Sequence, residues 1–261
     1  MKKIITVLTT LLMVVIMAGC SNKTEATVET TDSEYVKNKG VLVVGITDFA
    51  PMDYKDANGN WIGFDADLAT KFAEELGVKV EFVEINWDNK VLDLNDKAID
   101  CVWNGMTLTD AVKNQMETSK AYILNAQTAV VKKDVAANIN SIDDLKELSV
   151  AVEVGSAGKA SAESNGLDFV ELDTQAKALL EVNAGTSDAA IIDLTMAKAM
   201  TGEGTDYTNL TYTVLLDEEE YGVGFRKGSD LAEMLNAFLA NNTAAVEEIA
   251  LTYGLENALV D

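Results

Sequence analysis

Apolar and polar positions along the chain follow two periods in turn, and this alternation predicts an α/β protein. Short apolar runs bounded by turn residues predict buried strands, the first of them at 41–45. Apolar residues three and four positions apart over 66–76 predict an amphipathic helix that Asp65 caps and Gly77 ends. The same reasoning predicts strands at 78–84, 99–103, 129–132, 149–154, 189–192 and 221–225, and helices at 88–97, after 155, at 174–183, through 199, at 231–241 and at 244–253.

The order of these elements predicts two α/β units in tandem, because strand and helix alternate up to 103 and again after 149. Between the first strand and the first helix, the Asp/Asn/Gly cluster at 56–60 predicts a turn between two short strands. A calcium loop is the alternative interpretation, but the spacing does not match an EF-hand.

The N-terminus has the pattern of a secretory signal. Two lysines precede an apolar run over 4–17 that is too short to span a membrane comfortably, and small residues lead from it to Cys20. We predict a signal peptide over 1–19, a lipidated Cys20 and a flexible tether over 20–39, with the protein anchored on the outer face of the cell membrane. A cleaved signal with an incidental cysteine is the alternative.

Composition narrows the function classes. The net charge of −23 argues against nucleic acid and anionic lipid surfaces as partners. The chain has no histidine, which removes most zinc sites and every Ser-His-Asp triad. Cys101 has no partner once Cys20 is lipidated, so we predict that it is a buried strand residue. We expect no cofactor or metal, and a monomer.

Five segments carry a more specific pattern: 63–69 (GFDADLA), 99–109 (IDCVWNGMTLT), 152–156 (VEVGS), 187–193 (SDAAIID) and 221–228 (YGVGFRKG). In this order they resemble the bacterial extracellular solute-binding proteins of family 3, the polar amino acid receptors of ABC importers. The resemblance implies an α/β periplasmic-binding-protein fold of type II, in which two open mixed sheets are joined by two hinge strands. It implies a first lobe at 40–126 plus 221–261, a second lobe at 127–220, and a ligand cleft between them.

The function that the resemblance implies is extracytoplasmic capture of a small amino-acid-like solute and its delivery to the permease of an ABC importer. A ligand that touches both lobes would stabilise their closed arrangement, and no bond is made or broken. An enzyme on the same scaffold, such as a dehydratase, is the alternative from another class. It would need a perturbed carboxylic acid, for which Glu153 or Asp48 could be nominated. A sensor domain is a third possibility.

The ligand contacts that the resemblance implies fall on both lobes. In the second lobe, Asp193 stands where the family meets the ligand amino group, with a helix N-cap as its alternative role. Gly155 and Ser156 match the small-residue ligand loop of the family. In the first lobe, the implied contacts are an acid and an aromatic wall at Asp48 and Phe49, and a polar loop that holds the ligand carboxylate at Asn104, Gly105 and Thr107. Trp61, Trp87 and Trp103 are candidate walls of the cleft, and Trp103 is preferred because it directly precedes Asn104, with core packing as the alternative for at least one of them.

Two departures from the family pattern bear on the ligand. The arginine that grips the ligand carboxylate would stand at Val112, and Ala157 occupies the place of a common hydroxyl. Lys113 is adjacent, but one residue further round a helix points about 100° away. Arg226, the single arginine, falls in a segment that is structural in the family. Two ligand classes therefore stay open: a free α-amino acid, and an amine or derivative whose carboxylate is absent or masked.

Overall fold

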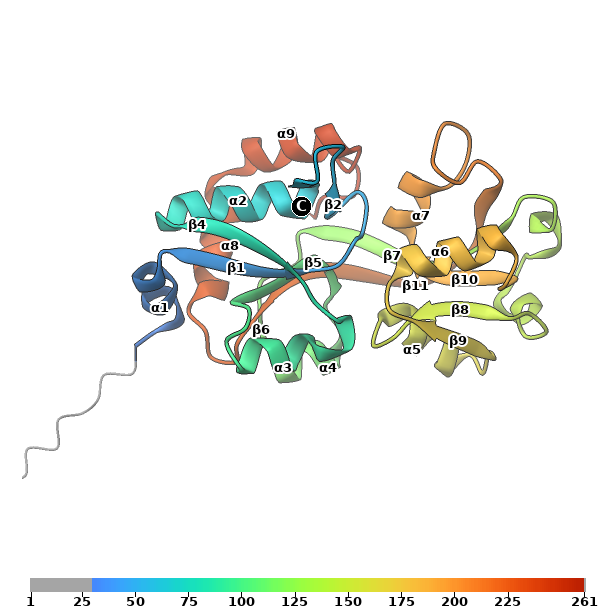
Figure 1. Cartoon of the computed structure of the whole chain (residues 1–261), viewed down its shortest axis with the longest axis horizontal. Helices are drawn as coiled ribbons and strands as arrows, with labels where there is room; N and C mark the ends of the chain where they lie inside the picture. Colours follow the sequence, from blue (N-terminus) through green and yellow to red (C-terminus); the bar gives the residue numbers. More distant parts are fainter. Residues whose placement is uncertain (1–29, 261) are drawn as a thin grey trace, which may run out of the picture.

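Two long strands, β7 (Ile123–Lys132) and β11 (Leu210–Phe225), run between two α/β bodies and join them (Figure 1). This computed structural model describes residues 30–260. The bodies are the two lobes of a type II periplasmic-binding fold, so the predicted fold class is confirmed. We propose that the lobe boundaries fall within β7 and β11, because both strands pair with each other along most of their length.

The strands form one continuous mixed sheet in the order β4-β1-β5-β11-β7-β10-β8-β9, with β6 paired to β11. In the first lobe, β1 is parallel to β4 and β5, whereas β11 is antiparallel to β5. In the second lobe, β8 is parallel to β9 and β10. The bounds are β1 Val41–Ile46, β4 Lys79–Glu84, β5 Cys101–Thr107, β6 Glu117–Thr118, β8 Val150–Glu153, β9 Phe169–Leu172 and β10 Ala189–Asp193, and a separate hairpin contains β2 Tyr54–Lys55 and β3 Trp61–Ile62.

Helices cover both faces of each part of the sheet, as sheets with parallel strands require (Figure 1). In the first lobe, α2 (Phe64–Leu76), α8 (Leu231–Asn241) and α9 (Thr243–Tyr253) lie on one face, and α3 (Lys90–Asn95) and α4 (Asp110–Gln115) on the other. In the second lobe, α6 (Gln175–Ala184) and α7 (Leu194–Met200) face α5 (Ala157–Ser164) across the sheet. Short 3-10 turns occur at η1 Trp87–Asn89, η2 Ala136–Asn138 and η3 Ile142–Leu145.

Most predicted elements are present, and the differences have local causes. The predicted helix at 88–97 is divided into η1 and α3. The predicted N-cap role of Asp65 is wrong, because the N-cap is Gly63, two residues earlier, and Asp65 is a fully buried carboxyl inside the first turn of α2. Cys101 is a buried free thiol in β5, as predicted. No helix within residues 30–260 has the length and apolar character needed to cross a membrane.

The predicted flexible tether is wrong over its last eight residues, which form helix α1 (Asp32–Lys39). Thr31 and Glu34 cap this helix reciprocally, and Val36 packs into the core. The signal peptide, Cys20 and the tether as far as residue 29 lie outside the described residues.

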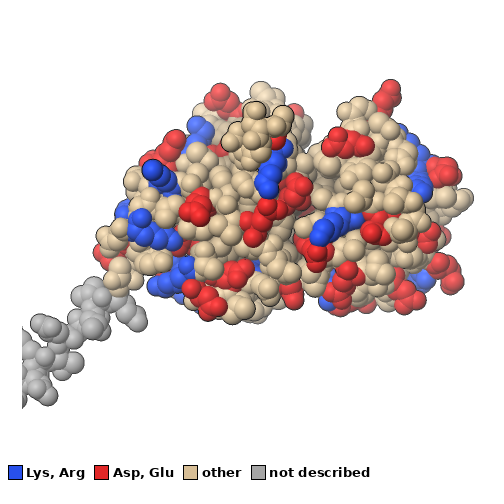
Figure 2. Space-filling model, viewed as in Figure 1, with Lys and Arg blue, Asp and Glu red and all other residues tan. Residues whose placement is uncertain are grey.

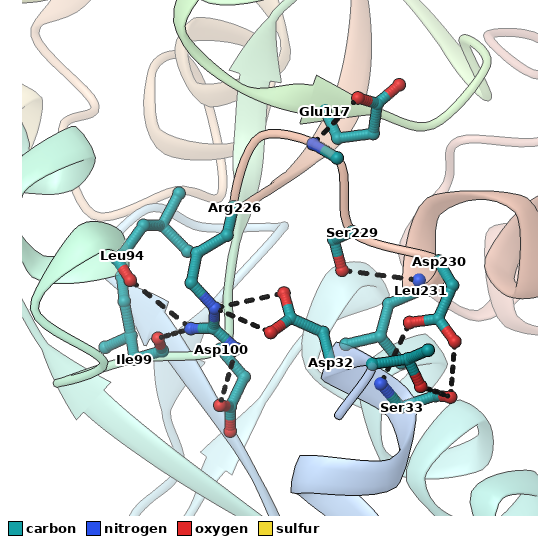
Figure 3. A network of polar contacts seen from close by, with 12 residues as sticks. Asp32, Ser33, Leu94, Ile99, Asp100, Glu117, Arg226, Ser229, Asp230 and Leu231 are labelled. Atoms are coloured by element: carbon teal, nitrogen blue, oxygen red, sulfur yellow. Dashed lines mark hydrogen bonds and ion pairs between the residues drawn. The ribbon is translucent and has the colours of Figure 1, made fainter. Parts of the chain in front are cut away.

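Arg226 fixes α1 to the first lobe (Figure 3). Its Nε donates to both carboxylate oxygens of Asp32 at 3.0 Å, and its other nitrogens donate to the carbonyl of Ile99 and to the buried Asp100. Lys39, the last residue of α1, pairs with the second oxygen of Asp100 at 2.6 Å. Arg226 is therefore structural, as the resemblance implied, and it does not line the cleft.

Candidate ligand cleft

A cavity of about 700 Å³ lies between the two lobes. The C-terminal ends of β1 and β5 contribute to its wall in the first lobe, and the ends of β8 and β10 contribute in the second. These strand ends are where open α/β sheets bind small polar molecules. Seven of the nine predicted ligand contacts line the cavity: Phe49, Asn104, Gly105, Thr107, Gly155, Ser156 and Asp193.

The other two predicted contacts are corrected by the structure. Trp103 is 0% exposed and packs edge-on against Phe72 of α2, with ring centroids 6.1 Å apart. Neighbouring residues of a strand point to opposite faces, so Trp103 faces the core whereas Asn104 lines the cavity. Asp48 is exposed and does not line the cavity, whereas the adjacent Phe49 is buried and does.

Phe49 lies directly over Gly105 on the cavity wall. Gly105 has a φ of +53°, and a Cβ there would stand 2.5 Å from the Phe49 ring and 3.1 Å from the Tyr221 ring. Phe49 and Tyr221 in turn pack edge to face, with centroids 6.3 Å apart. The glycine therefore allows an aromatic wall to approach the polar loop at the end of β5.

Two buried carboxyls support this loop from behind. Asp65 accepts the Gly105 N–H at 2.6 Å, and Asp53 accepts the Asn104 Nδ2 at 2.7 Å. Burial raises the pKa of Asp65 to about 7, and burial together with the charge of Asp65 raises the pKa of Asp53 well above its usual range. The Asn104 Oδ1 accepts from the backbone and hydroxyl of Thr47, so its side chain ties β5 to the end of β1. The side-chain hydrogen bonds of Asn104 are thus made within the first lobe.

Asp193 ends β10 as a buried carboxylate that faces the cavity. Its Oδ1 accepts from the Tyr221 hydroxyl at 2.6 Å, from Asn125 Nδ2 at 2.6 Å and from Gln127 Nε2 at 3.0 Å, and its Oδ2 accepts from Gln175 Nε2. All four donors are neutral. Within residues 30–260 no lysine or arginine forms an ion pair with Asp193, so a buried negative charge lies on the cavity wall without a positive partner.

The side chain of Asp193 does not act as a helix cap, which was its alternative predicted role. Asp193 occupies the N-cap position of α7, but its carboxylate makes no cap hydrogen bond. Asn125 instead accepts the Thr195 N–H at 3.1 Å. The Asp193 carboxylate therefore does not cap α7, which was the alternative role that the sequence left open for it.

The wall in the second lobe also contains Glu153, at the end of β8. Its side chain is 3% exposed, and its Oε1 has no hydrogen-bond partner. Burial, followed by the charge of Asp193, raises the pKa of Glu153 to about 8, although Lys90 opposes the shift. Burial therefore favours the protonated form of Glu153, which lines the cavity with one oxygen that has no hydrogen-bond partner.

The lobes touch each other beside this carboxyl. Gly155 has a φ of +69°, and a Cβ there would stand 2.7 Å from Asp88 Oδ1 and 3.0 Å from Asp88 Cα. Lys90 of the first lobe donates to the Gly155 carbonyl at 3.2 Å and to the Trp87 carbonyl at 2.9 Å. Ser156 begins α5 by accepting the Lys159 N–H at 3.0 Å, so its hydroxyl orients this loop. The cleft is closed over the cavity at this point.

Several lining residues were not among the predicted ligand contacts. Thr47, Trp87, Lys90, Glu153 and Gln175 all line the cavity. Trp87 was a candidate wall in the sequence only through its residue type, and Glu153 only as a possible acid. Lys90 falls inside a helical pattern, where a lysine normally indicates the solvated face, so no sequence signal marks it.

The departures from the family pattern also lie at the cavity. Val112 and Ala157 both line it, whereas Lys113 is exposed and does not. Within residues 30–260, no group of three or more histidine, cysteine or acidic side chains is arranged to hold a metal ion. On the face shown in Figure 2, acidic and basic side chains both lie beside the furrow between the lobes.

Comparison with known proteins agrees with this geometry. The L-cystine-binding protein TcyJ of Escherichia coli is 29% identical over 78% of this chain and 78% of its own length. The solved structure of the arginine-bound form of a truncated ArgBP from T. maritima is 33% identical, with a TM-score of 0.75, over 80% of this chain and 99% of that one. An ancestral amino acid-binding protein, AncCDT-1, described as a precursor of cyclohexadienyl dehydratase, is 31% identical, with a TM-score of 0.77, over 85% of this chain and 98% of that one.

The family described as bacterial extracellular solute-binding proteins, family 3, matches residues 42–255, which include both lobes and both joining strands. The chain therefore belongs to the bacterial extracellular solute-binding proteins of family 3.

Proposed function

We propose that the cleft binds a free α-amino acid outside the cytoplasm, and that the closed complex delivers it to the permease of an ABC importer. The observation that carries this proposal is Asp193, a buried carboxylate on the cavity wall held by four neutral donors. An ammonium group of the ligand would supply the missing positive charge. The relatives named for cystine and arginine support an amino acid as the ligand class.

An amine, or a derivative with a masked carboxylate, is the alternative ligand class. Val112 on the cavity wall supports it, because the resemblance implies an arginine for the ligand carboxylate at this position. Ligands of both classes would place an ammonium at Asp193. Binding measurements with each class of ligand therefore distinguish the two, whereas substitution of Asp193 does not.

The test is a thermal-shift screen of a chain that begins at Ser21 against the twenty L-amino acids, L-cystine, and their decarboxylated amines. A ligand at a hundred times its dissociation constant adds about 2.7 kcal/mol to the free energy of unfolding, or roughly 5–10 °C in Tm for a protein of this size. The Asp193→Asn protein should lose the shift, and the matched Asp168→Asn protein, altered at an exposed aspartate of the same lobe, should keep it. A full shift in the Asp193→Asn protein would contradict the proposed role of this carboxylate.

Catalysis is the second candidate function, and Glu153 is the observation that favours it. A buried carboxyl with a pKa of about 8 in a cleft has the properties of a general acid. The similarity to AncCDT-1, an amino acid-binding protein described as a dehydratase precursor, supports the same idea. Turnover of a bound ligand, abolished by Glu153→Gln with binding retained, would establish an enzyme. Recovery of every bound ligand unchanged would leave solute binding as the function.

We further propose that Cys20 carries the lipid anchor and that the receptor works as a monomer. Mass spectrometry of the membrane fraction tests the first point. A chain released from the membrane, unmodified at Cys20, would contradict it.

A further inference from the structure

Lys90 is held at the cavity between the lobes. The residue is 9% exposed, and its ammonium donates to the carbonyl of Trp87 in the first lobe and to the carbonyl of Gly155 in the second. The ammonium also lies 4.7 Å from the centroid of the Trp87 ring. A lysine ammonium has three donors, and two of them are accounted for by these carbonyls. The group is therefore fixed in position with one N–H left for another acceptor.

This ammonium has no carboxylate partner. Among the ion pairs of residues 30–260 none includes Lys90, although a carboxylate oxygen within 4.0 Å would form one. Glu153 and Asp88 lie close enough to favour the charged form of Lys90, but neither forms an ion pair with it, and burial favours the protonated form of Glu153. Desolvation nevertheless lowers the pKa of Lys90, because burial disfavours a charged ammonium.

The other cations near the cavity are already engaged or point elsewhere. Lys159 lines the cavity, but its ammonium is 3.1 Å from Glu171 and 3.7 Å from Glu163. Lys113 is exposed and outside the lining. Lys90 is thus the buried cation without an ion pair among the described lining residues.

We propose that Lys90 is the specificity-determining residue that binds the anionic group of the ligand, in place of the arginine that position 112 lacks. The inference rests on the proposed function, because it assumes that the cleft binds an amino acid. A zwitterion would place its ammonium at Asp193 of the second lobe and its carboxylate at Lys90 of the first. The ligand would then bridge the two lobes, and each end would neutralise a buried charge.

The test is the affinity of wild-type and Lys90→Met proteins for matched pairs of probes that differ by one α-carboxylate: L-arginine and agmatine, L-histidine and histamine, and L-glutamate and γ-aminobutyrate. Isothermal titration calorimetry gives the ratio of affinities within each pair. We expect the wild-type protein to prefer an amino acid over its decarboxylated partner, and Lys90→Met to weaken that amino acid tenfold to a hundredfold. Binding of the decarboxylated partner should change by less than threefold.

The ratio separates charge recognition from the loss of the Lys90 contact with Gly155. A lysine that only held the lobes together would, when removed, weaken both members of a pair equally, and that result would overturn the inference. The matched Lys159→Met protein, which lacks the other cation of the lining, should keep the wild-type ratio. The inference would also be overturned if Lys90→Met kept its affinity for the amino acid within threefold. If the wild-type protein bound no amino acid, the proposed function would be refuted, and the inference with it.

Discussion

Replacing Glu153 by glutamine should change how the stability of the empty protein depends on pH. Glu153 is 3% exposed, one of its oxygens has no partner, and burial together with Asp193 raises its pKa from the ordinary 4.5 to about 8. Between these two values the folded protein holds a proton that the unfolded chain releases. The free energy of unfolding therefore falls as pH rises through this window, and the loss is complete above pH 8.

The size of the effect follows from the shift. A change from 4.5 to about 8 spans roughly 3.5 pKa units, each equivalent to 1.36 kcal/mol, so ionising Glu153 costs the fold about 4–5 kcal/mol. The Glu153→Gln protein has a neutral amide of the same shape and avoids this cost. The two proteins should have similar stability at pH 5, and the variant should be the more stable by pH 9, by roughly 10–20 °C in Tm.

Urea unfolding from pH 5 to pH 9 measures the difference directly. Asp65 and Glu219, whose pKa values burial raises to about 7 and about 9, titrate in both proteins and cancel in the comparison. The matched Glu163→Gln protein removes a carboxylate at the exposed rim of the same cavity and should follow the wild-type curve. Parallel curves for the wild-type and Glu153→Gln proteins across the whole range would refute the reasoning.

Two further substitutions test other parts of the structure. Arg226→Met removes the partner of Asp32 and leaves the buried Asp100 with Lys39 as its remaining ion-pair partner, so it should cost about 3–5 kcal/mol in urea unfolding while ligand affinity stays unchanged. An unchanged unfolding midpoint would contradict the account of α1. Gly155→Ala places a Cβ 3.0 Å from Asp88 Cα at a φ of +69°, so the two lobes should close incompletely around the ligand. Small-angle scattering should show this incomplete closure, and ligand affinity should fall about tenfold. Full compaction with unchanged affinity would show that the lobes do not meet there.

The framework of the fold follows from the sequence because its strands and helices have clear apolar periods. Strands such as β1 and β10 are nearly continuous apolar runs, and the last two helices have complete apolar stripes. Residues 210–220 of β11 were not predicted, since residues 217–220 are all acidic and most side chains of this part are only partly buried or exposed. Helix α1 was missed because its docking depends on Arg226, which lies 194 residues away along the chain.

The candidate site was predicted in outline but not in its chemistry. The resemblance located the loops at Gly105 and Gly155 and the carboxylate at Asp193, all of which line the cavity. It could not show that the Asn104 amide is used within its own lobe, because that depends on Thr47 and Asp53 from another loop. Nor could it find Lys90, whose position in the cleft depends on contact between the two lobes.

A crystal structure with the amino acid that gives the largest thermal shift tests the central claim most directly. The account predicts the amino acid within the cavity between the lobes, with its ammonium nitrogen within about 3 Å of an Asp193 carboxylate oxygen. A ligand bound outside this cavity, or inside it with its ammonium away from Asp193, would contradict the account.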